Sequence, residues 1–162
     1  EFCENLNVRH IIERHPIWEI VFKTREEKNP CSLCARMRHG ILHKICIENN
    51  CNVIALGHNM DDVVETFFMN IFNGGRISTF SPVSYLSRKN LNMIRPLVFC
   101  KESEISRFAN KNNFPVCKSL CPQDKNSSRQ NMKILIKNLE STYPKLKEKV
   151  MHAIKSTGLN DW

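Results

Sequence analysis

The sequence predicts an α/β protein, with a partial parallel sheet, flanking helices and further helices at the C-terminus. Two observations predict this class. Short apolar runs alternate with amphipathic segments along most of the chain, and such alternation favours parallel strands with helices on their faces. Lysine-rich amphipathic segments follow from residue 127 onward, which predicts closing helices.

Length and composition indicate one folded domain without a membrane span. The 162 residues are 41% hydrophobic and 25% charged, which is typical of a globular chain and excludes a disordered one. The most apolar stretch, 63–72, is interrupted by Glu65 and Asn70, so no run of about 18 apolar residues exists. Residues 1–7 lack a secretory-signal pattern, so we expect a cytoplasmic protein with no membrane partner.

Net charge and cysteine content restrict the kinds of binding partner that we expect. The 24 Lys and Arg against 16 Asp and Glu leave a net charge of +8, which favours a polyanion such as nucleic acid, although such a surplus also serves solubility alone. Eight cysteines are fewer than a disulfide scaffold of this length needs. In a reducing compartment these thiols stay free or bind metal.

Four segments are predicted in the first fifty residues. A strand is expected over 8–13, and a second apolar run covers 17–22. The polar stretch 24–29 reads as a linker closed by Pro30. From Cys31 apolar residues recur every fourth position, which predicts an amphipathic helix that ends near residue 49 or 50.

The middle of the chain predicts a strand followed by a helix. The apolar run 52–57 is typical of a buried parallel strand, and 59–72 has helical spacing that Gly74-Gly75 terminates. Residues 77–88 read as a loop or a short hairpin. Ligands of such sheets lie beyond the carboxyl ends of the strands, so the loop after Leu56 is a candidate site.

The last third predicts a strand over 93–99, in which Pro96 indicates an edge or a bend, and a helix over 101–112. Residues 114–126 read as a loop. Ser127 and Gln130 resemble a capping box that opens the next helix. The inward face of that helix is expected to carry Met132, Leu135, Ile136 and Leu139, and Pro144 ends the helix. A last helix is predicted over 145–156.

Cysteines at the start of the first long helix predict a metal or redox site. Cys31 and Cys34 place two thiols within reach of one metal, and a helix N-terminus favours their thiolate form. Cys117 and Cys121 lie on a later loop that can fold back onto them. Spacing alone leaves a redox pair, a zinc site and an iron–sulfur cluster open.

A second candidate site lies where the strand 52–57 turns into a helix. Backbone amides at such a turn hold phosphate, and Asp61 and Asp62 are suited to a magnesium ion or a ribose hydroxyl. Acidic residues in a first turn also simply stabilise the helix. Basic residues on the helix after Cys34 and on the C-terminal helices suit a nucleic-acid backbone, although solvated helix surfaces look similar.

Together these motifs resemble the tRNA 2-thiocytidine synthetase family, the PP-loop ATP pyrophosphatase-type tRNA sulfurtransferases. The resemblance covers most of the chain, and the motifs occur in the family's order. They are Cys31-Ser-Leu-Cys34, Arg36-Met-Arg-His-Gly40, Ala55-Leu-Gly-His58 with Asp61-Asp62 and Glu65-Thr66, Asn73-Gly-Gly-Arg76, Ile94-Arg-Pro-Leu97, Cys100-Lys-Glu, Leu120-Cys121 and Arg129-Gln130.

The resemblance implies an adenine nucleotide alpha-hydrolase-like fold. Residues 1–116 would form the C-terminal portion of the PP-loop nucleotide-binding domain, and 117–162 the cysteine loop with basic helices. It implies ATP-dependent thiolation of a tRNA cytidine through an adenylated intermediate and sulfur bound at a cluster. The cofactors are a [4Fe-4S] cluster, ATP and Mg2+, and the partners are tRNA and a persulfide sulfur carrier.

The resemblance also assigns site residues. The cluster ligands are Cys31, Cys34 and Cys121, whereas Cys117 is out of register. Three thiolates leave one iron open, as in sites that hold an exchangeable ligand. The nucleotide-binding residues are Gly57, His58, Asp61 and Asp62. From the basic helix faces, taken with this resemblance, the expected tRNA-binding residues are Arg36, Arg38, Arg76, Arg129 and Lys133.

One departure from the family is the absence of its glycine-rich SGGxDS phosphate loop. We therefore expect a fragment of a longer enzyme that is inactive alone and that forms a homodimer or self-associates through exposed strand edges. Two other functions stay open. One is another PP-loop tRNA-modifying enzyme, and the other is a non-catalytic, zinc-stabilised RNA-binding module.

Overall fold

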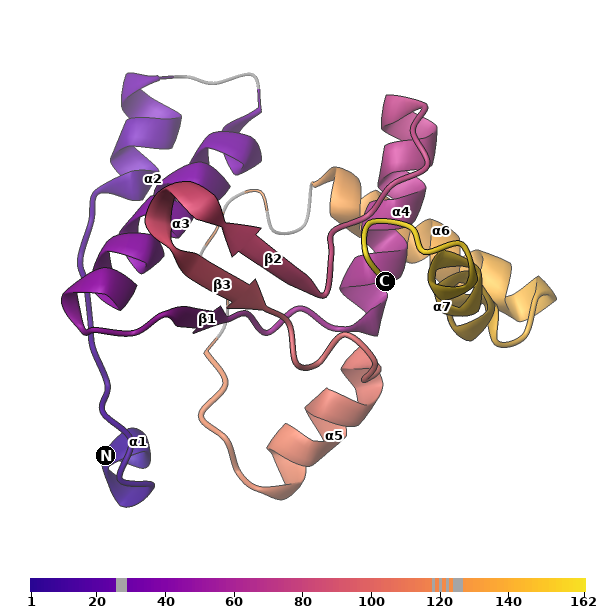
Figure 1. The fold of residues 1–162 in the computed structure, drawn as a ribbon. Helices are drawn as coiled ribbons and strands as arrows, with labels where there is room; N and C mark the ends of the chain where they lie inside the picture. The colour runs from indigo at the N-terminus through magenta and orange to yellow at the C-terminus, as the bar shows by residue number, and fades with distance from the viewer. Residues whose placement is uncertain (26–28, 118, 120, 122, 124–126) are drawn as a thin grey trace. The chain divides into compact units, whose positions relative to one another are not determined.

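The computed structural model describes residues 1–25, 29–117, 119, 121, 123 and 127–162 (Figure 1). It divides into two compact units. The first comprises Glu1–Asn50 with Pro115–Cys117, and the second Cys51–Phe114 with Lys118–Trp162. Each unit is described by itself below. The predicted division of the chain at residues 116 and 117 stays a prediction.

The first unit is helical. It contains α1 (Phe2–Asn5), α2 (Ile17–Glu19) with the π-helical turn η1 (Ile20–Thr24), and α3 (Pro30–Glu48). The strand predicted over 8–13 is wrong, because residues 8–16 have no regular structure. Val8 and Ile12 are 57% and 67% exposed. An apolar alternation without a neighbouring strand has no ladder of hydrogen bonds to hold it extended.

The long helix α3 follows the sequence prediction closely. Asn29 caps it, since its side-chain oxygen accepts a hydrogen bond from Ser32 N at 3.4 Å. Pro30 occupies the first turn, where its missing N–H costs nothing. The helix ends at Glu48, next to the predicted end. Cys31 and Cys34 therefore lie in its first turns.

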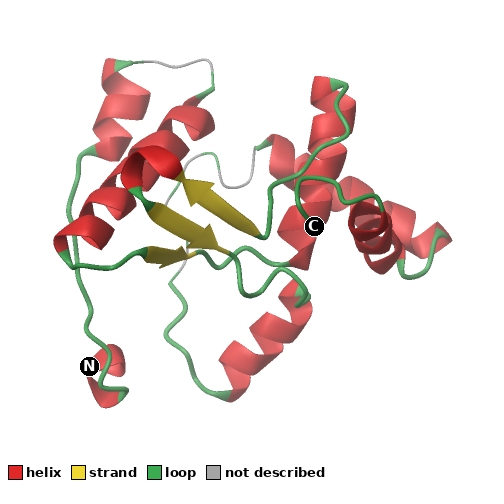
Figure 2. Cartoon of the chain, in the orientation of Figure 1, coloured by secondary structure: helices red, strands yellow, loops and turns green. Residues whose placement is uncertain are grey.

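The second unit contains a three-stranded mixed sheet of order β1-β3-β2 (Figure 2). β1 (Val53–Ala55) pairs in parallel with β3 (Leu91–Ile94), with Ile54 opposite Met93. β2 (Val83–Leu86) pairs antiparallel with β3 through the short turn η2 (Ser87–Lys89). The sheet is therefore mixed: β1 and β3 form the expected parallel pair, and β2 adds an antiparallel strand. A connection this short is too short for a crossover, so it makes the hairpin that was one of the two predictions for 77–88.

Two strand predictions need correction. β1 is an edge strand among the described strands, so Val53 is 42% exposed and not buried as predicted. The strand predicted over 93–99 begins at Leu91 and ends at Ile94. Pro96 cannot donate to a ladder, and the chain turns over residues 96–99. Pro96 therefore marks a bend after the central strand.

Four helices complete the second unit: α4 (Met60–Gly74), α5 (Glu102–Lys111), α6 (Ser128–Thr142) and α7 (Leu146–Ser156). All four match predicted helices to within a few residues. Gly75 caps the C-terminus of α4, with the left-handed φ of 59° that glycine adopts without a steric cost. No helix among the described residues is long and apolar enough to cross a membrane. The cytoplasmic location stays a prediction.

The core of this unit lies where α4 packs against α6 and α7, which lie side by side in Figure 1. Val63 of α4, Ile136 of α6 and Ile154 of α7 are at most 2% exposed. Leu135 was predicted to face inward but is 39% exposed. Met132 and Ile136, one turn apart, already supply the buried stripe of α6, and Leu135 lies to one side of it.

Candidate functional site

The site lies at the start of α4, beyond the carboxyl ends of β1 and β3. These two strands are parallel, so their carboxyl ends share one edge of the sheet. Leu56 N donates to Ile94 O at 2.9 Å and extends the pairing into the loop after β1. Met60 N then donates to Cys100 O at 2.9 Å and fixes the first turn of α4 beside the start of α5.

A capping box begins α4. Asp62 N donates to Asn59 Oδ1 at 3.2 Å, and Asn59 N donates to Asp62 Oδ2 at 3.0 Å. Two of the backbone N–H groups that a helix start leaves unpaired are satisfied in this way. One oxygen of Asp62 is thus occupied by its own helix, and the other is left for a partner.

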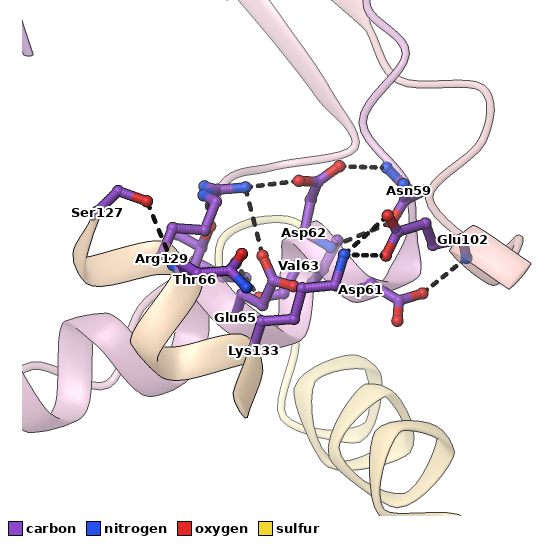
Figure 3. A network of polar contacts seen from close by, with 12 residues as sticks. Asn59, Asp61, Asp62, Val63, Glu65, Thr66, Glu102, Ser127, Arg129 and Lys133 are labelled. Atoms are coloured by element: carbon purple, nitrogen blue, oxygen red, sulfur yellow. Dashed lines mark hydrogen bonds and ion pairs between the residues drawn. The ribbon is translucent and has the colours of Figure 1, made fainter. Parts of the chain in front are cut away.

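That partner is Arg129 of α6 (Figure 3). Its guanidinium donates to Asp62 Oδ1 at 2.5 Å and to Thr66 Oγ1 at 3.2 Å, and lies 3.7 Å from Glu65 Oε2. Asp62, Glu65 and Thr66 are spaced to share one face of α4. A single arginine therefore joins the first turns of α4 and α6.

Glu65 is a buried carboxyl group in this network. It is 6% exposed, and burial raises its pKa to about 7. The Arg129 guanidinium opposes this effect, and the nearby Asp62 carboxylate adds to it. Glu65 therefore exchanges a proton close to neutral pH.

Asp61 shows the opposite balance. Burial acts to raise its pKa, but a hydrogen bond from Glu102 N at 2.7 Å and an ion pair with Lys147 at 2.7 Å outweigh it and leave the pKa below its ordinary value. Lys147 of α7 also lies 3.2 Å from Glu140 of α6. Asp61 is therefore a permanent anion at neutral pH, and it ties α4 to α5 and α7.

These side chains surround a cavity of about 220 Å³. Lys133 closes one side and donates to both oxygens of Glu102, at 2.8 and 2.5 Å. Carboxylates and cations thus face the same space, which suits a ligand that carries both hydrogen-bond donors and acceptors. The lining residues are Asn59, Asp61, Asp62, Glu65, Glu102, Ser127, Arg129, Gln130 and Lys133.

The structure gives less support to a magnesium ion at this point. Every oxygen of Asp61 and Asp62 already accepts a hydrogen bond, two of them from the cations Lys147 and Arg129. A magnesium ion prefers free carboxylate oxygens and bound water. Magnesium binding by Asp61 and Asp62 stays a prediction.

The predicted nucleotide-binding and tRNA-binding residues of the second unit fall into three places. Asp61, Asp62, Arg129 and Lys133 line the one cavity just described. Gly57 and His58 lie on the loop before it, with the His58 ring 5.0 Å from the ring of Phe80. Arg76 is exposed beyond the far end of α4, roughly 20 Å along the helix axis.

The predicted cluster ligands are divided between the units. Cys31 and Cys34 lie on α3 of the first unit with the exposed Arg36 and Arg38, and Cys121 belongs to the second unit. None of these cysteines forms a disulfide. Among the described residues, no three His, Cys, Asp or Glu side chains are grouped to hold a metal ion. The convergence of Cys121 on the other two thiols stays a prediction, as does tRNA binding by the arginines.

The sequence interpretation gave no role in this site to Glu65, Glu102 or Lys147. Glu65 follows Asp61 by four positions and Asp62 by three, so helical spacing alone places it on their face. Glu102 belongs to the motif at Cys100, next to a predicted helix start. Lys147 had no local signal, because its contact with Asp61 spans 86 positions.

The sheet, the loop after β1 and the cavity define an α/β domain with a polar site beyond the carboxyl ends of its parallel strands. Residues 1–138 match the PP-loop domain family, and the chain belongs to it. This confirms the predicted fold class. A solved structure that resembles the chain is the U34-tRNA thiolase NcsA from Methanococcus maripaludis with its [4Fe-4S] cluster. The TM-score is 0.76 at 28% identity, with 96% of this chain and 54% of that chain covered.

Two curated relatives are similar to the chain at higher sequence identity. A tRNA-cytidine(32) 2-sulfurtransferase from Hahella chejuensis is 35% identical over 158 residues, which are 96% of this chain and 55% of the relative. The protein of the same name from Paracoccus denitrificans is 40% identical over 146 residues, 89% of this chain and 49% of the relative. The resemblance drawn from the motifs is confirmed. The chain spans about half the length of these relatives.

Proposed function

We propose that the chain is part of an ATP-dependent tRNA sulfurtransferase that replaces the C2 oxygen of a cytidine with sulfur. The observation that carries this proposal is the similarity, over 89–96% of the chain, to proteins named tRNA-cytidine(32) 2-sulfurtransferase. Their name makes cytidine 32 the target that we propose. The polar cavity at the start of α4 supports the same reading, because it offers donors and acceptors to a nucleotide.

We propose ATP as the activating cosubstrate, with Gly57, His58, Asp61 and Asp62 on the nucleotide side of the site. Attack of the cytidine C2 oxygen on the α-phosphate of ATP forms a new O–P bond and releases pyrophosphate. AMP then becomes a good leaving group at C2, and attack by sulfur displaces it. Glu65 is placed to take or give a proton during these steps, since its carboxyl group lines the cavity and titrates near neutral pH.

The sulfur chemistry is assigned to Cys31, Cys34 and Cys121. Cys31 and Cys34 fit a soft metal centre, because they are three positions apart on one face of α3, close to its N-terminus, and carry no disulfide. With Cys121 they would hold a [4Fe-4S] cluster, which supplies a site for the sulfur that is transferred. The structural neighbour NcsA, which carries a [4Fe-4S] cluster, supports this assignment. A persulfide carrier is the sulfur donor that we propose, with a thiol reductant that supplies the two electrons needed to release its outer sulfur as sulfide.

We propose that basic residues on the surface and at the cavity bind the tRNA substrate. Arg36 and Arg38 are exposed on α3, and Arg76 is exposed after α4. Arginine contacts to phosphate position an RNA without reading its sequence. Arg129 and Lys133 reach the cavity itself, so we propose that they act close to the target nucleotide.

Mass spectrometry of tRNA nucleosides from a strain that lacks the gene tests the function. The proposal expects 2-thiocytidine to disappear and to return when the gene is restored, but not when it carries Cys34→Ser. Loss of lysidine with 2-thiocytidine intact would instead assign another PP-loop tRNA-modifying activity. Unchanged nucleosides would favour a non-catalytic RNA-binding module.

A further inference from the structure

A groove lined by lysines lies between α5, α6 and α7. Its volume is about 380 Å³, and it adjoins the cavity at the start of α4, because Asp61, Glu102 and Lys133 line both. We call it the lysine groove. Its other lining residues are Lys101, Ser103, Ser106, Lys137, Glu140 and Lys147.

Three of the four lysines are paired with carboxylates. Lys101 contacts Glu148 at 2.5 Å, and Lys133 contacts Glu102. Lys147 is the most enclosed, with a side chain that is 23% exposed and two carboxylate partners, Asp61 and Glu140. These two partners lie on α4 and α6, so Lys147 joins three helices and is a structural residue.

Lys137 differs from the other three. Among the residues that the structure describes, no carboxylate lies within ion-pair distance of its ammonium group. It is exposed, and it follows Arg129 and Lys133 at intervals of four positions, so the three cations form one stripe along α6. This stripe runs from the cavity at the start of α4 into the lysine groove.

We propose that the lysine groove binds a phosphodiester of the tRNA substrate, with Lys137 as its main cationic contact. This inference rests on the proposed function. A phosphodiester carries one negative charge and accepts hydrogen bonds, and lysine and serine side chains are common donors to it. The exposed hydroxyl groups of Ser103 and Ser106 supply such donors.

The ion pair of Lys133 with Glu102, next to Lys137, is exposed enough for Lys133 to assist in phosphate binding. The side chains of Lys133 and Glu102 are 46% and 43% exposed, and exposed ion pairs contribute little free energy. Lys133 therefore exchanges Glu102 for a phosphate oxygen at small cost. The groove then positions the RNA backbone beside the cavity that receives the target nucleotide.

The test is the salt dependence of tRNA binding by the full-length protein that contains this chain, measured by fluorescence anisotropy from about 50 to 200 mM salt. The wild-type chain is compared with Lys137→Gln and with the control Lys111→Gln. Lys111 is also an exposed lysine, at the end of α5, but it does not line the groove. Circular dichroism establishes that both variants are folded.

Lys137→Gln is expected to weaken tRNA binding. It should also make the negative slope of log K against log salt shallower by about 1, the contribution of one phosphate contact. Lys111→Gln is expected to leave the slope unchanged. If the wild-type chain binds tRNA and Lys137→Gln keeps its slope, or if both variants lower it equally, the groove proposal is overturned and the proposed function is not. If the full-length wild-type protein binds no tRNA, both are contradicted.

Discussion

The buried carboxyl group of Glu65 makes the stability of the chain depend on pH. Its pKa rises from an ordinary 4.5 to about 7 on folding. The folded chain therefore binds this proton more tightly than the unfolded chain does. The resulting stabilisation is fully present below about pH 4.5 and is lost as the pH rises through about 7. One pKa unit corresponds to about 1.4 kcal/mol, so the full shift corresponds to about 3 kcal/mol.

Glu65→Gln isolates this contribution, because glutamine has nearly the same shape and no charge. Urea unfolding of both chains from pH 5 to pH 9 gives the difference in their free energies of unfolding. Relative to the wild-type chain, the free energy of unfolding of Glu65→Gln should increase as the pH rises, by up to about 3 kcal/mol. Contributions from the histidines are common to both chains and cancel. Glu19→Gln, at an exposed carboxylate, serves as control and should give a flat difference. A flat difference for Glu65→Gln as well would refute the reasoning.

Three further predictions concern the stability of individual elements. A double-mutant cycle of Arg129→Gln and Asp62→Asn should give a coupling free energy of about 1–2 kcal/mol in urea unfolding, because the pair is partly exposed; a coupling near zero would contradict the bridge between α4 and α6. Gly75→Ala should lower the free energy of unfolding by about 1 kcal/mol, since φ is 59°, whereas Gly40→Ala inside α3 should raise it by a similar amount, and both positions have space for the methyl group. Ile154→Ala should cost about 2–5 kcal/mol, which thermal unfolding would detect as a clear fall in Tm.

Local signals predicted the helices well. Asn59 and Gly74-Gly75 mark the two ends of α4, and Ser127 accepts a hydrogen bond from Gln130 N at the start of α6. Such caps act within one turn, so they are visible in the sequence. The loop after Leu56 was also correctly placed at the carboxyl end of a strand, because alternation of strands and helices determines that edge.

Contacts between distant segments were not predictable in the same way. A strand at 8–13 requires a partner, and no pattern within those six positions shows whether one exists. Arg129 had the signature of a free basic face, yet its guanidinium binds Asp62, 67 positions away. The raised pKa of Glu65 depends on its burial, which only the folded structure shows.

We propose that Cys31, Cys34 and Cys121 bind one iron–sulfur cluster. The most direct measurement is the iron and acid-labile sulfide content of the anaerobically purified protein that contains this chain, compared with its Cys121→Ser variant. We expect iron and sulfide in the proportion of a [4Fe-4S] cluster, and loss of both in the variant. Stoichiometric zinc without iron, or a cluster that Cys121→Ser leaves intact, would contradict it.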